Sequence, residues 1–226
     1  FISTKYNSLA SCINRHDDFF AMVDRARIQA KNDTGENSDI VDTNTTHLCV
    51  WDKQGMAVSI TLTLGNHFGT GELAPGGFFY NNGLRNYTEQ VAGYPADYPE
   101  NAGPISAKSP VMVVQNGRLW LILGGAGSDR IIFNTAVTMA RVMSGYSLRQ
   151  SIAAPRFYLD YRNRLTLEWH PDQRLLAEAA AMLPDVSIKP GCDDFFGLIS
   201  AISRKKDGSL ETAADHRRDG SCAVEP

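Results

Sequence analysis

Hydrophobic and polar positions alternate along residues 47–63, except at a short polar interruption, KQG, at residues 53–55. Alternation of this kind is typical of β-strands, and the interruption is typical of a three-residue hairpin loop with glycine in the left-handed position. Counting outward from that loop along both strands places Thr45 opposite Thr63. The pattern therefore predicts an antiparallel hairpin with this register.

The two faces of this hairpin differ in chemistry, because successive side chains of a strand point to opposite sides. One face is apolar and is the expected core face; it carries Leu48, Val50, Val58, Ile60 and Leu62. The other face is small and polar; it carries Thr45, His47, Cys49, Trp51, Ala57, Ser59, Thr61 and Thr63. Threonine is a good strand former, so the polar face by itself is compatible with a purely structural role.

Further elements follow from the same periodicities. Residues 117–125 form an apolar run that ends in glycines and predicts a buried strand. The spacing predicts a buried helix over 130–143 and a second helix over 147–157, capped by Ser147 and stopped at Pro155. The other expected elements are a helix over 17–31, a polar linker over 32–44, short strands at 157–161 and 165–169 with Asn163 in the turn, a helix over 172–183, and a closing hairpin over 195–214 that turns at 206–208.

Composition narrows the class of protein without identifying it. The chain has 226 residues, of which 43% are hydrophobic and 21% charged, and its formal net charge is −3. This is ordinary globular composition and gives no broad basic face for nucleic acid. No apolar run approaches the roughly 18 residues of a membrane helix. The chain starts with Phe1 and without an apolar leader, so we expect a processed product or a fragment.

Cysteine and histidine spacing gives no sign of a metal site. The cysteines are Cys12, Cys49, Cys192 and Cys222, and they contain no CxxC pair. Neither a disulfide framework nor a zinc site is expected from this scatter. The histidines show no metal-ligand spacing either, so we expect no metal and no cofactor. For His47 we expect packing or hydrogen bonding within the sheet.

Six segments resemble, in order, the small subunit of the γ-glutamyltransferase family, which are N-terminal nucleophile hydrolases. They are TTHLCVWDKQGMAVSITLTLGNHFGTG at 45–71, FFYNNGLRNY at 78–87, GPISAKSP at 103–110, LGGAGSDRI at 123–131, APRF at 154–157 and ADHRRDGS at 214–221. Each segment alone is weak, but together they occur in family order over residues 45–222, about four fifths of the chain. The run GGAGSDR lacks the GK[ST] of a P-loop, which excludes that reading.

The resemblance implies a catalytic role for several residues. Thr45 matches the nucleophile, whose own α-amine becomes the general base once the chain cleaves itself after Asn44. Thr63 matches the residue that hydrogen-bonds the nucleophile, in agreement with the hairpin register. Gly127 and Ser128 match the two backbone N–H donors of the oxyanion hole, although Ser128 stands where the family has glycine.

The resemblance is weaker at the substrate-binding positions. Asn86 stands where typical members carry a carboxylate for the α-amine of the substrate, and Arg85 adds a positive charge beside it. Of the paired serines that bind the α-carboxylate, Ser106 remains and the second is Ala107. Two further family positions are glycines here, Gly65 and Gly83. The sequence thus implies conserved chemistry with an altered substrate pocket.

We therefore expect an α+β chain that supplies part of a four-layer αββα sandwich of the N-terminal nucleophile hydrolase type. Residues 1–44 would be the tail and linker of the large subunit, and residues 45–226 the catalytic region of the small subunit. The expected partners are the remainder of the large subunit and a small amide substrate. Two alternatives remain open at this point: the same chemistry on a different acidic amide or acyl-amide, or an unprocessed fragment without activity.

Overall fold

The computed structural model describes residues 45–65, 68–83, 106–160, 162–170, 172–181, 183 and 185–224. The predicted helix over 17–31 and the linker over 32–44 lie outside these residues. Helices and strands are both present, as expected for an α+β chain.

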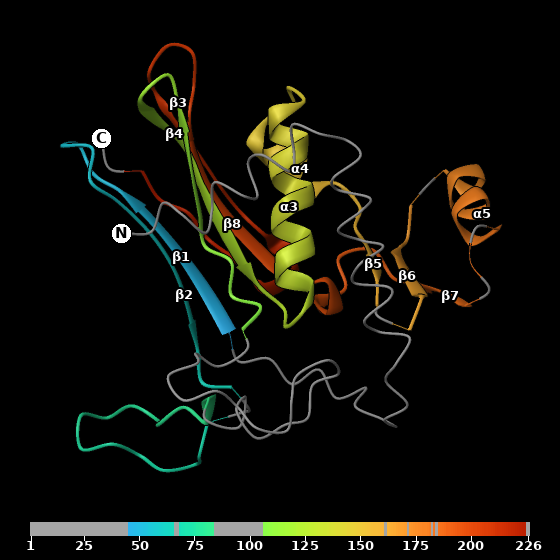
Figure 1. Ribbon diagram of the computed structural model, residues 1–226, viewed down its shortest axis with the longest axis horizontal. Coiled ribbons are helices and arrows are strands. Elements are labelled where there is room, and N and C mark those ends of the chain that lie inside the picture. The colour runs from blue at the N-terminus through green and yellow to red at the C-terminus, as the bar shows by residue number, and fades with distance from the viewer. Residues whose placement is uncertain are drawn as a thin grey trace, which may run out of the picture.

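A four-stranded antiparallel sheet forms the centre of the structure (Figure 1). Its order is β3 (Val111–Gln115), β4 (Arg118–Ala126), β8 (Leu198–Arg204) and β9 (Leu210–Ala214). The predicted strand over 117–125 and the closing hairpin are thereby confirmed, and β8 and β9 turn around Gly208. Because β8 comes from the end of the chain and pairs with β4, segments far apart in the sequence make up the core.

Two helices cover one face of this sheet (Figure 1). They are α3 (Arg130–Met143) and α4 (Leu148–Ala153), and α3 has the predicted bounds. Ser147 caps α4 as predicted, through a capping box with Gln150, and the helix ends shortly before Pro155. The core between helices and sheet is apolar; its fully or nearly buried side chains include Leu121, Leu123, Met139, Val142, Leu148, Ile152 and Ile199.

The hairpin covers the opposite face of the sheet, with the predicted register but the reverse orientation. Strands β1 (Thr45–Trp51) and β2 (Ala57–Thr63) pair Thr45 with Thr63, and Gly55 has the expected positive φ of 93°. The expected core face is wrong: its five apolar side chains are 37–53% exposed in the described structure. The polar face packs against β4 and β8 instead.

The reason for this orientation lies in the sheet beneath. Gly124 leaves no room for a side chain, since a Cβ there would lie 2.3 Å from a ring carbon of His47. The hydroxyl of Ser59 and the thiol of Cys49 donate to the carbonyls of Leu123 and Ser200, respectively. Small side chains with hydrogen-bond donors therefore fit this interface, whereas large aliphatic side chains do not.

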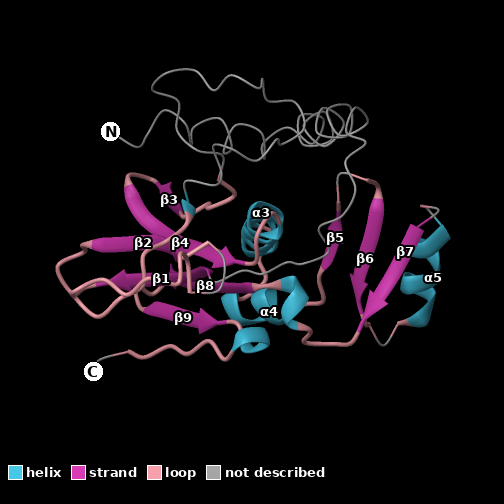
Figure 2. Ribbon diagram, turned by 90° about the horizontal axis from the view of Figure 1, so that it is seen from below, coloured by secondary structure: helices cyan, strands magenta, loops and turns pink. Residues whose placement is uncertain are grey.

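A smaller sheet extends beyond the helices (Figure 2). It contains β5 (Phe157–Leu159), β6 (Arg164–Glu168) and β7 (Asp185–Lys189), with β6 and β7 parallel. The helix α5 (Gln173–Ala181) connects those two strands and packs Leu176 against Leu165 and Leu167. The predicted strands and helix are present here: β5 and α5 are shorter than expected, β6 is shifted by one residue, and Asn163 occupies the turn with φ 60°.

Two 3-10 turns complete the described chain, η2 (Asp194–Phe196) and η3 (His216–Arg218). They contact each other at the edge of the central sheet. Within the described residues, no helix has the length and apolar composition needed to cross a membrane.

Candidate active site

The hydroxyls of Thr45 and Thr63 meet at the open end of the hairpin. Thr45 Oγ1 donates to Thr63 Oγ1 over 2.9 Å, and Thr63 Oγ1 also accepts from the backbone N–H of Gly65 at 3.0 Å. This contact follows directly from the register, because directly opposed residues of an antiparallel pair have neighbouring side chains. The structure thus brings together the predicted nucleophile and its predicted hydrogen-bond partner.

His47 holds the hairpin against the sheet two residues after Thr45. Its Nδ1 lies 2.8 Å from Thr61 Oγ1, and its Nε2 lies 3.2 Å from Cys49 Sγ and 3.3 Å from Ser59 Oγ. Since Cys49 and Ser59 already donate to backbone carbonyls, they accept from an Nε2–H, which leaves Nδ1 to accept from Thr61. The imidazole is therefore a neutral, fully hydrogen-bonded part of the layer interface.

Burial explains the titration behaviour of this network. The side chain of His47 is only 6% exposed, and desolvation lowers its pKa from 6.5 to about 4. Burial raises the pKa of the Cys49 thiol to about 12, against a smaller opposing effect of its hydrogen bond to Ser59. With these pKa values the imidazole of His47 is neutral and the thiol of Cys49 is protonated at neutral pH, as expected for groups that pack within the sheet.

The loop after β4 contains the two residues predicted to form the oxyanion hole, Gly127 and Ser128. Gly127 and Ser128 both have positive φ, 134° and 58°, and within the described residues their N–H groups make no hydrogen bond. Gly127 packs against Gly197, where an added Cβ would lie 3.0 Å from the Cα of Gly197.

This loop and the start of β1 lie at the same end of the stacked layers (Figure 1). The backbone N–H groups of Gly127 and Ser128, which make no hydrogen bond among the described residues, therefore lie at the end of the molecule where Thr45 lies. A serine with φ 58° costs on the order of 1 kcal/mol relative to glycine, but it retains the backbone donor.

Buried charged side chains fix the backbone segment that packs against this loop, Phe196 and Gly197. Asp215 is fully buried and accepts from the guanidinium of Arg156, from the N–H of Ile199 and from Arg217. Arg156 also donates to the carbonyls of Phe196 and Gly197 at 3.0 and 3.3 Å. Glu168 pairs with Arg217 at 2.6 Å. Burial lowers the pKa of Arg156 to about 10, with Asp215 opposing the shift, so the guanidinium stays charged at neutral pH.

Arg130 also helps to fix the loop after β4, and nothing in the sequence pattern indicated this role. It follows the loop directly, is 3% exposed, and stacks 4.3 Å from the ring centroid of Phe195. Its Nε and one terminal nitrogen have no hydrogen-bond partner in the described structure. The cation–π contact ties the first turn of α3 to η2. The segments APRF and ADHRRDGS contain Arg156, Asp215 and Arg217, but the spacing of these residues does not reveal which charges pair.

The remaining predicted site residues are Ser106, Arg85 and Asn86. Ser106 is exposed, and its hydroxyl accepts from the N–H of Lys108 within its own loop. Arg85 and Asn86 lie outside the described residues. Their proposed contacts with substrate stay predictions.

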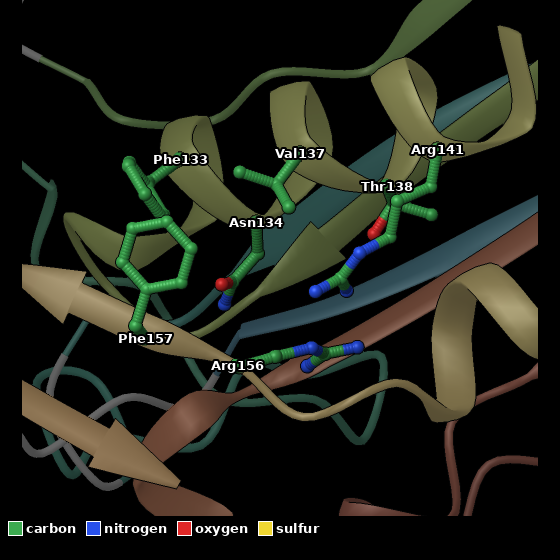
Figure 3. A pocket seen from close by; sticks show the side chains of 7 residues that line it. All are labelled: Phe133, Asn134, Val137, Thr138, Arg141, Arg156 and Phe157. Atoms are coloured by element: carbon green, nitrogen blue, oxygen red, sulfur yellow. The ribbon is translucent and has the colours of Figure 1, made fainter. Parts of the chain in front are cut away.

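A recess between α3 and β5 is lined by Phe133, Asn134, Val137, Thr138, Arg141, Arg156 and Phe157 (Figure 3). It lies on the helix side of the sheet, away from the hairpin. Asn134 and Arg156 donate to the carbonyl of Phe196, and Arg141 donates to that of Pro155. Because its polar groups hold the backbone in place, this recess has a structural role. Among the described residues, no group of three or more potential metal ligands clusters.

The fold matches solved N-terminal nucleophile hydrolases of one type. The γ-glutamyltranspeptidase from Pseudomonas nitroreducens, solved in complex with L-DON, superposes with a TM-score of 0.68 at 27% identity. The match covers 80% of this chain and 100% of that chain. The chain belongs to the γ-glutamyltranspeptidase family, whose family profile matches residues 4–225. That match reaches back to residue 4, well before the first segment that carried the resemblance.

Curated relatives include both hydrolases and an acylase. The glutathione hydrolase proenzyme of Escherichia coli is 31% identical over 211 residues, which make up 86% of this chain and 35% of the relative. The acylase ACY 1 proenzyme of Pseudomonas sp. is 28% identical over 198 residues, or 85% of this chain and 34% of the relative. The chain thus spans about a third of the length of these relatives.

We expect the Thr63→Val variant to lose roughly 5- to 30-fold in kcat, equivalent to about 1–2 kcal/mol in the barrier, the scale of one hydrogen bond. Valine keeps the strand shape but removes the hydroxyl that faces Thr45. The measurement is steady-state hydrolysis by the processed enzyme.

The matched control is Thr46→Val, which makes the same change on the exposed outer face of the same hairpin, in strand β1. It should leave turnover and thermal stability nearly unchanged. Equal activity of the Thr63→Val and Thr46→Val proteins would show that Thr63 has no part in catalysis.

Proposed function

We propose that this chain is the catalytic part of a γ-glutamyltransferase-like amidohydrolase that works through an acyl-threonine intermediate on Thr45. The observation that carries the proposal is the 2.9 Å hydrogen bond between the hydroxyls of Thr45 and Thr63 at the open end of the hairpin. A threonine hydroxyl needs both a partner to orient it and a base to accept its proton. Thr63 supplies the first, and the α-amine of Thr45 supplies the second after chain cleavage.

Self-cleavage would create that amine. In the proposed step, Thr45 Oγ1 attacks the carbonyl carbon of Asn44, the C–N bond to Thr45 breaks, and the acyl group moves to oxygen as an ester. Water then hydrolyses the ester, leaving a carboxylate on Asn44 and a free α-amine on Thr45. An α-amine titrates near pH 8, so a useful neutral fraction is present at pH 7. The name proenzyme carried by the E. coli relative agrees with such processing.

Turnover would use the same groups in a second reaction. The α-amine takes the proton from Thr45 Oγ1 as the oxygen attacks the amide carbonyl of the substrate. The N–H groups of Gly127 and Ser128, which lack partners in the described structure, would stabilise the oxyanion. The amine leaves with the proton, and water or a second amine then takes the acyl group from Thr45. These steps require no metal or cofactor.

We propose that the partner of this chain is the remainder of a large subunit, which completes a four-layer αββα sandwich. Two observations support it: the chain spans about a third of its curated relatives, and the five apolar side chains on the outer face of the hairpin are 37–53% exposed. A contiguous exposed apolar face is typical of a surface that another polypeptide covers. In this arrangement residues 1–44 form the tail of the large subunit, and residues 45–226 the small subunit.

The second candidate substrate class is an acidic amide or acyl-amide without an α-amine. It is favoured by Asn86, which is neutral where an ammonium-binding carboxylate is expected, and by the positive charge of Arg85. The similarity to a relative named an acylase proenzyme is compatible with an acyl-amide substrate.

We expect the Asn86→Asp variant to gain roughly ten- to a hundredfold in kcat/KM for a γ-glutamyl anilide, because a charged hydrogen bond to an ammonium is worth about 1.5–3 kcal/mol. The same variant should lose activity on a simple acidic anilide, since the new carboxylate would have no cationic partner there. Arg85→Ala should lower activity on the simple acidic anilide, because it removes the positive charge, and should spare activity on the γ-glutamyl anilide. The measurement is hydrolysis of both anilides by all three proteins.

Efficient cleavage of the γ-glutamyl anilide by the unmodified protein, insensitive to Asn86→Asp, would contradict the altered-pocket proposal. It would leave a conventional γ-glutamyltransferase and would not affect the proposed role of Thr45. Cleavage of neither anilide by a processed protein would point to a different acyl group.

A further inference from the structure

A cysteine and a histidine are paired at the surface, in a part of the chain that the proposed catalysis does not use. Cys192 Sγ lies 3.0 Å from His216 Nε2, and both residues are exposed. Cys192 lies in the turn after β7, and His216 is the first residue of η3. A thiol within hydrogen-bond distance of an imidazole can pass its proton to that base and react as a thiolate.

Buried contacts fix both members of this pair. The backbone N–H of Cys192 donates to Glu168 Oε1 at 2.8 Å and helps hold the residue at a φ of 64°, a conformation that non-glycine residues rarely adopt. Glu168 in turn pairs with Arg217, the residue directly after His216. One buried ion pair therefore anchors Cys192 through its backbone and His216 through its chain neighbour.

The other described cysteines lack this combination. Cys49 is partly buried, donates to the carbonyl of Ser200, and burial raises its pKa to about 12. Cys222 is exposed and free, but the described structure gives it no hydrogen-bond partner. Cys192 is thus the described cysteine that has both access to solvent and a neighbouring base.

We propose that Cys192 and His216 form a reactive thiol–imidazole pair, and that Cys192 is a site of S-thiolation by small disulfides. His216 Nε2 takes the proton of the thiol, and Cys192 Sγ attacks one sulfur of the disulfide R–S–S–R. The S–S bond breaks, a mixed disulfide Cys192–S–S–R forms, and R–S⁻ leaves and takes the proton from the imidazolium as R–SH. The thiol is oxidised and the disulfide is reduced, so electrons and protons balance.

The surroundings suit a transient thiolate. Arg217 and Arg218 follow His216 directly in η3, and the carboxylate of Asp193 beside Cys192 accepts from the N–H of Phe195. The carboxylate of Glu168 is neutralised by Arg217. The inference rests on none of the catalytic steps proposed for Thr45.

The test is the rate at which each cysteine of the purified full-length protein reacts with bis(2-hydroxyethyl) disulfide, followed by peptide mass spectrometry. This probe is neutral and contains no amide, so the proposed active site does not attract it. We expect Cys192 to react at least about fivefold faster than Cys222 at pH 7, and Cys49 to stay unmodified. His216→Gln should slow Cys192 about tenfold and leave Cys222 unchanged.

His170→Gln is the matched control, because the ring of His170 accepts from the N–H of Asp172 and, among the described residues, makes no hydrogen bond to Cys192. It should leave the rate at Cys192 unchanged. Equal rates at Cys192 and Cys222, or a rate at Cys192 that does not respond to His216→Gln in a protein of unchanged melting temperature, would overturn the proposal.

Discussion

The Thr45→Ala protein is expected to remain a single uncleaved chain and to lose turnover by at least about 10⁴-fold. The side chain of Thr45 supplies the attacking oxygen for both the proposed self-cleavage and the proposed acyl transfer. The fold should survive, because Thr45 contributes one hydrogen bond at the first position of β1 and no core contact. The measurements are denaturing electrophoresis, to detect cleavage, and anilide hydrolysis.

The Thr45→Ser variant keeps the hydroxyl of the side chain and removes its methyl group. Serine keeps an oxygen in reach of Thr63, so this variant should retain part of both activities. Cleavage of the Thr45→Ala protein at its usual site, or its normal turnover, would contradict the assignment of Thr45 as nucleophile.

The Asp215→Asn variant should lose about 3–5 kcal/mol of stability, because it leaves Arg156 and Arg217 with an uncompensated positive charge in a fully buried position. For a chain of this length, the melting temperature should fall on the order of 10 °C. Asparagine keeps the size of the side chain, so the loss reports the charge rather than a cavity. Thermal unfolding followed by circular dichroism measures it.

Glu178→Gln is the control for an ion pair in water. Glu178 pairs with Arg174 at 3.1 Å on the exposed face of α5, where such a pair contributes less than about 0.5 kcal/mol. Similar melting temperatures for the two variants would show that the buried charges do not hold the structure together.

The part of the site that sequence could predict is the part that depends on local geometry. A three-residue loop with Gly55 fixes the hairpin register, and the register places Thr63 beside Thr45 without any knowledge of the tertiary fold. The cap at Ser147 is local in the same sense, since its partner is three residues away.

The orientation of the hairpin could not be predicted in this way. Alternation defines two faces but does not say which one meets the sheet, and the usual rule chooses the apolar face. The decisive features are Gly124 and the carbonyls of Leu123 and Ser200, which belong to strands more than 60 residues away along the chain. They favour the small polar face.

Two strands were missed for different reasons. The turn before β4, Asn116-Gly117, has φ values of 51° and 74°, and this dipeptide between apolar runs is a recognised hairpin signal that would have revealed β3. In contrast, β7 is five residues long and pairs in parallel with β6 across α5. A short strand of mixed polarity is assigned by its partner, not by its own pattern.

Side-chain contacts between residues far apart in the sequence could not be predicted either. Arg156 meets Asp215 and Glu168 meets Arg217 across 59 and 49 positions, respectively, and the Cys192–His216 contact spans 24. Nothing in the local spacing of these residues distinguishes them from exposed charges. Only the tertiary fold brings them together.

The central claim is that Thr45 becomes the first residue of a catalytic subunit, and N-terminal sequencing of the active, full-length protein tests it most directly. Together with the intact mass of each piece, the measurement should show one polypeptide that ends at Asn44 and another that starts at Thr45. An active preparation that contains only uncleaved chain, with no N-terminus at Thr45, would contradict the account.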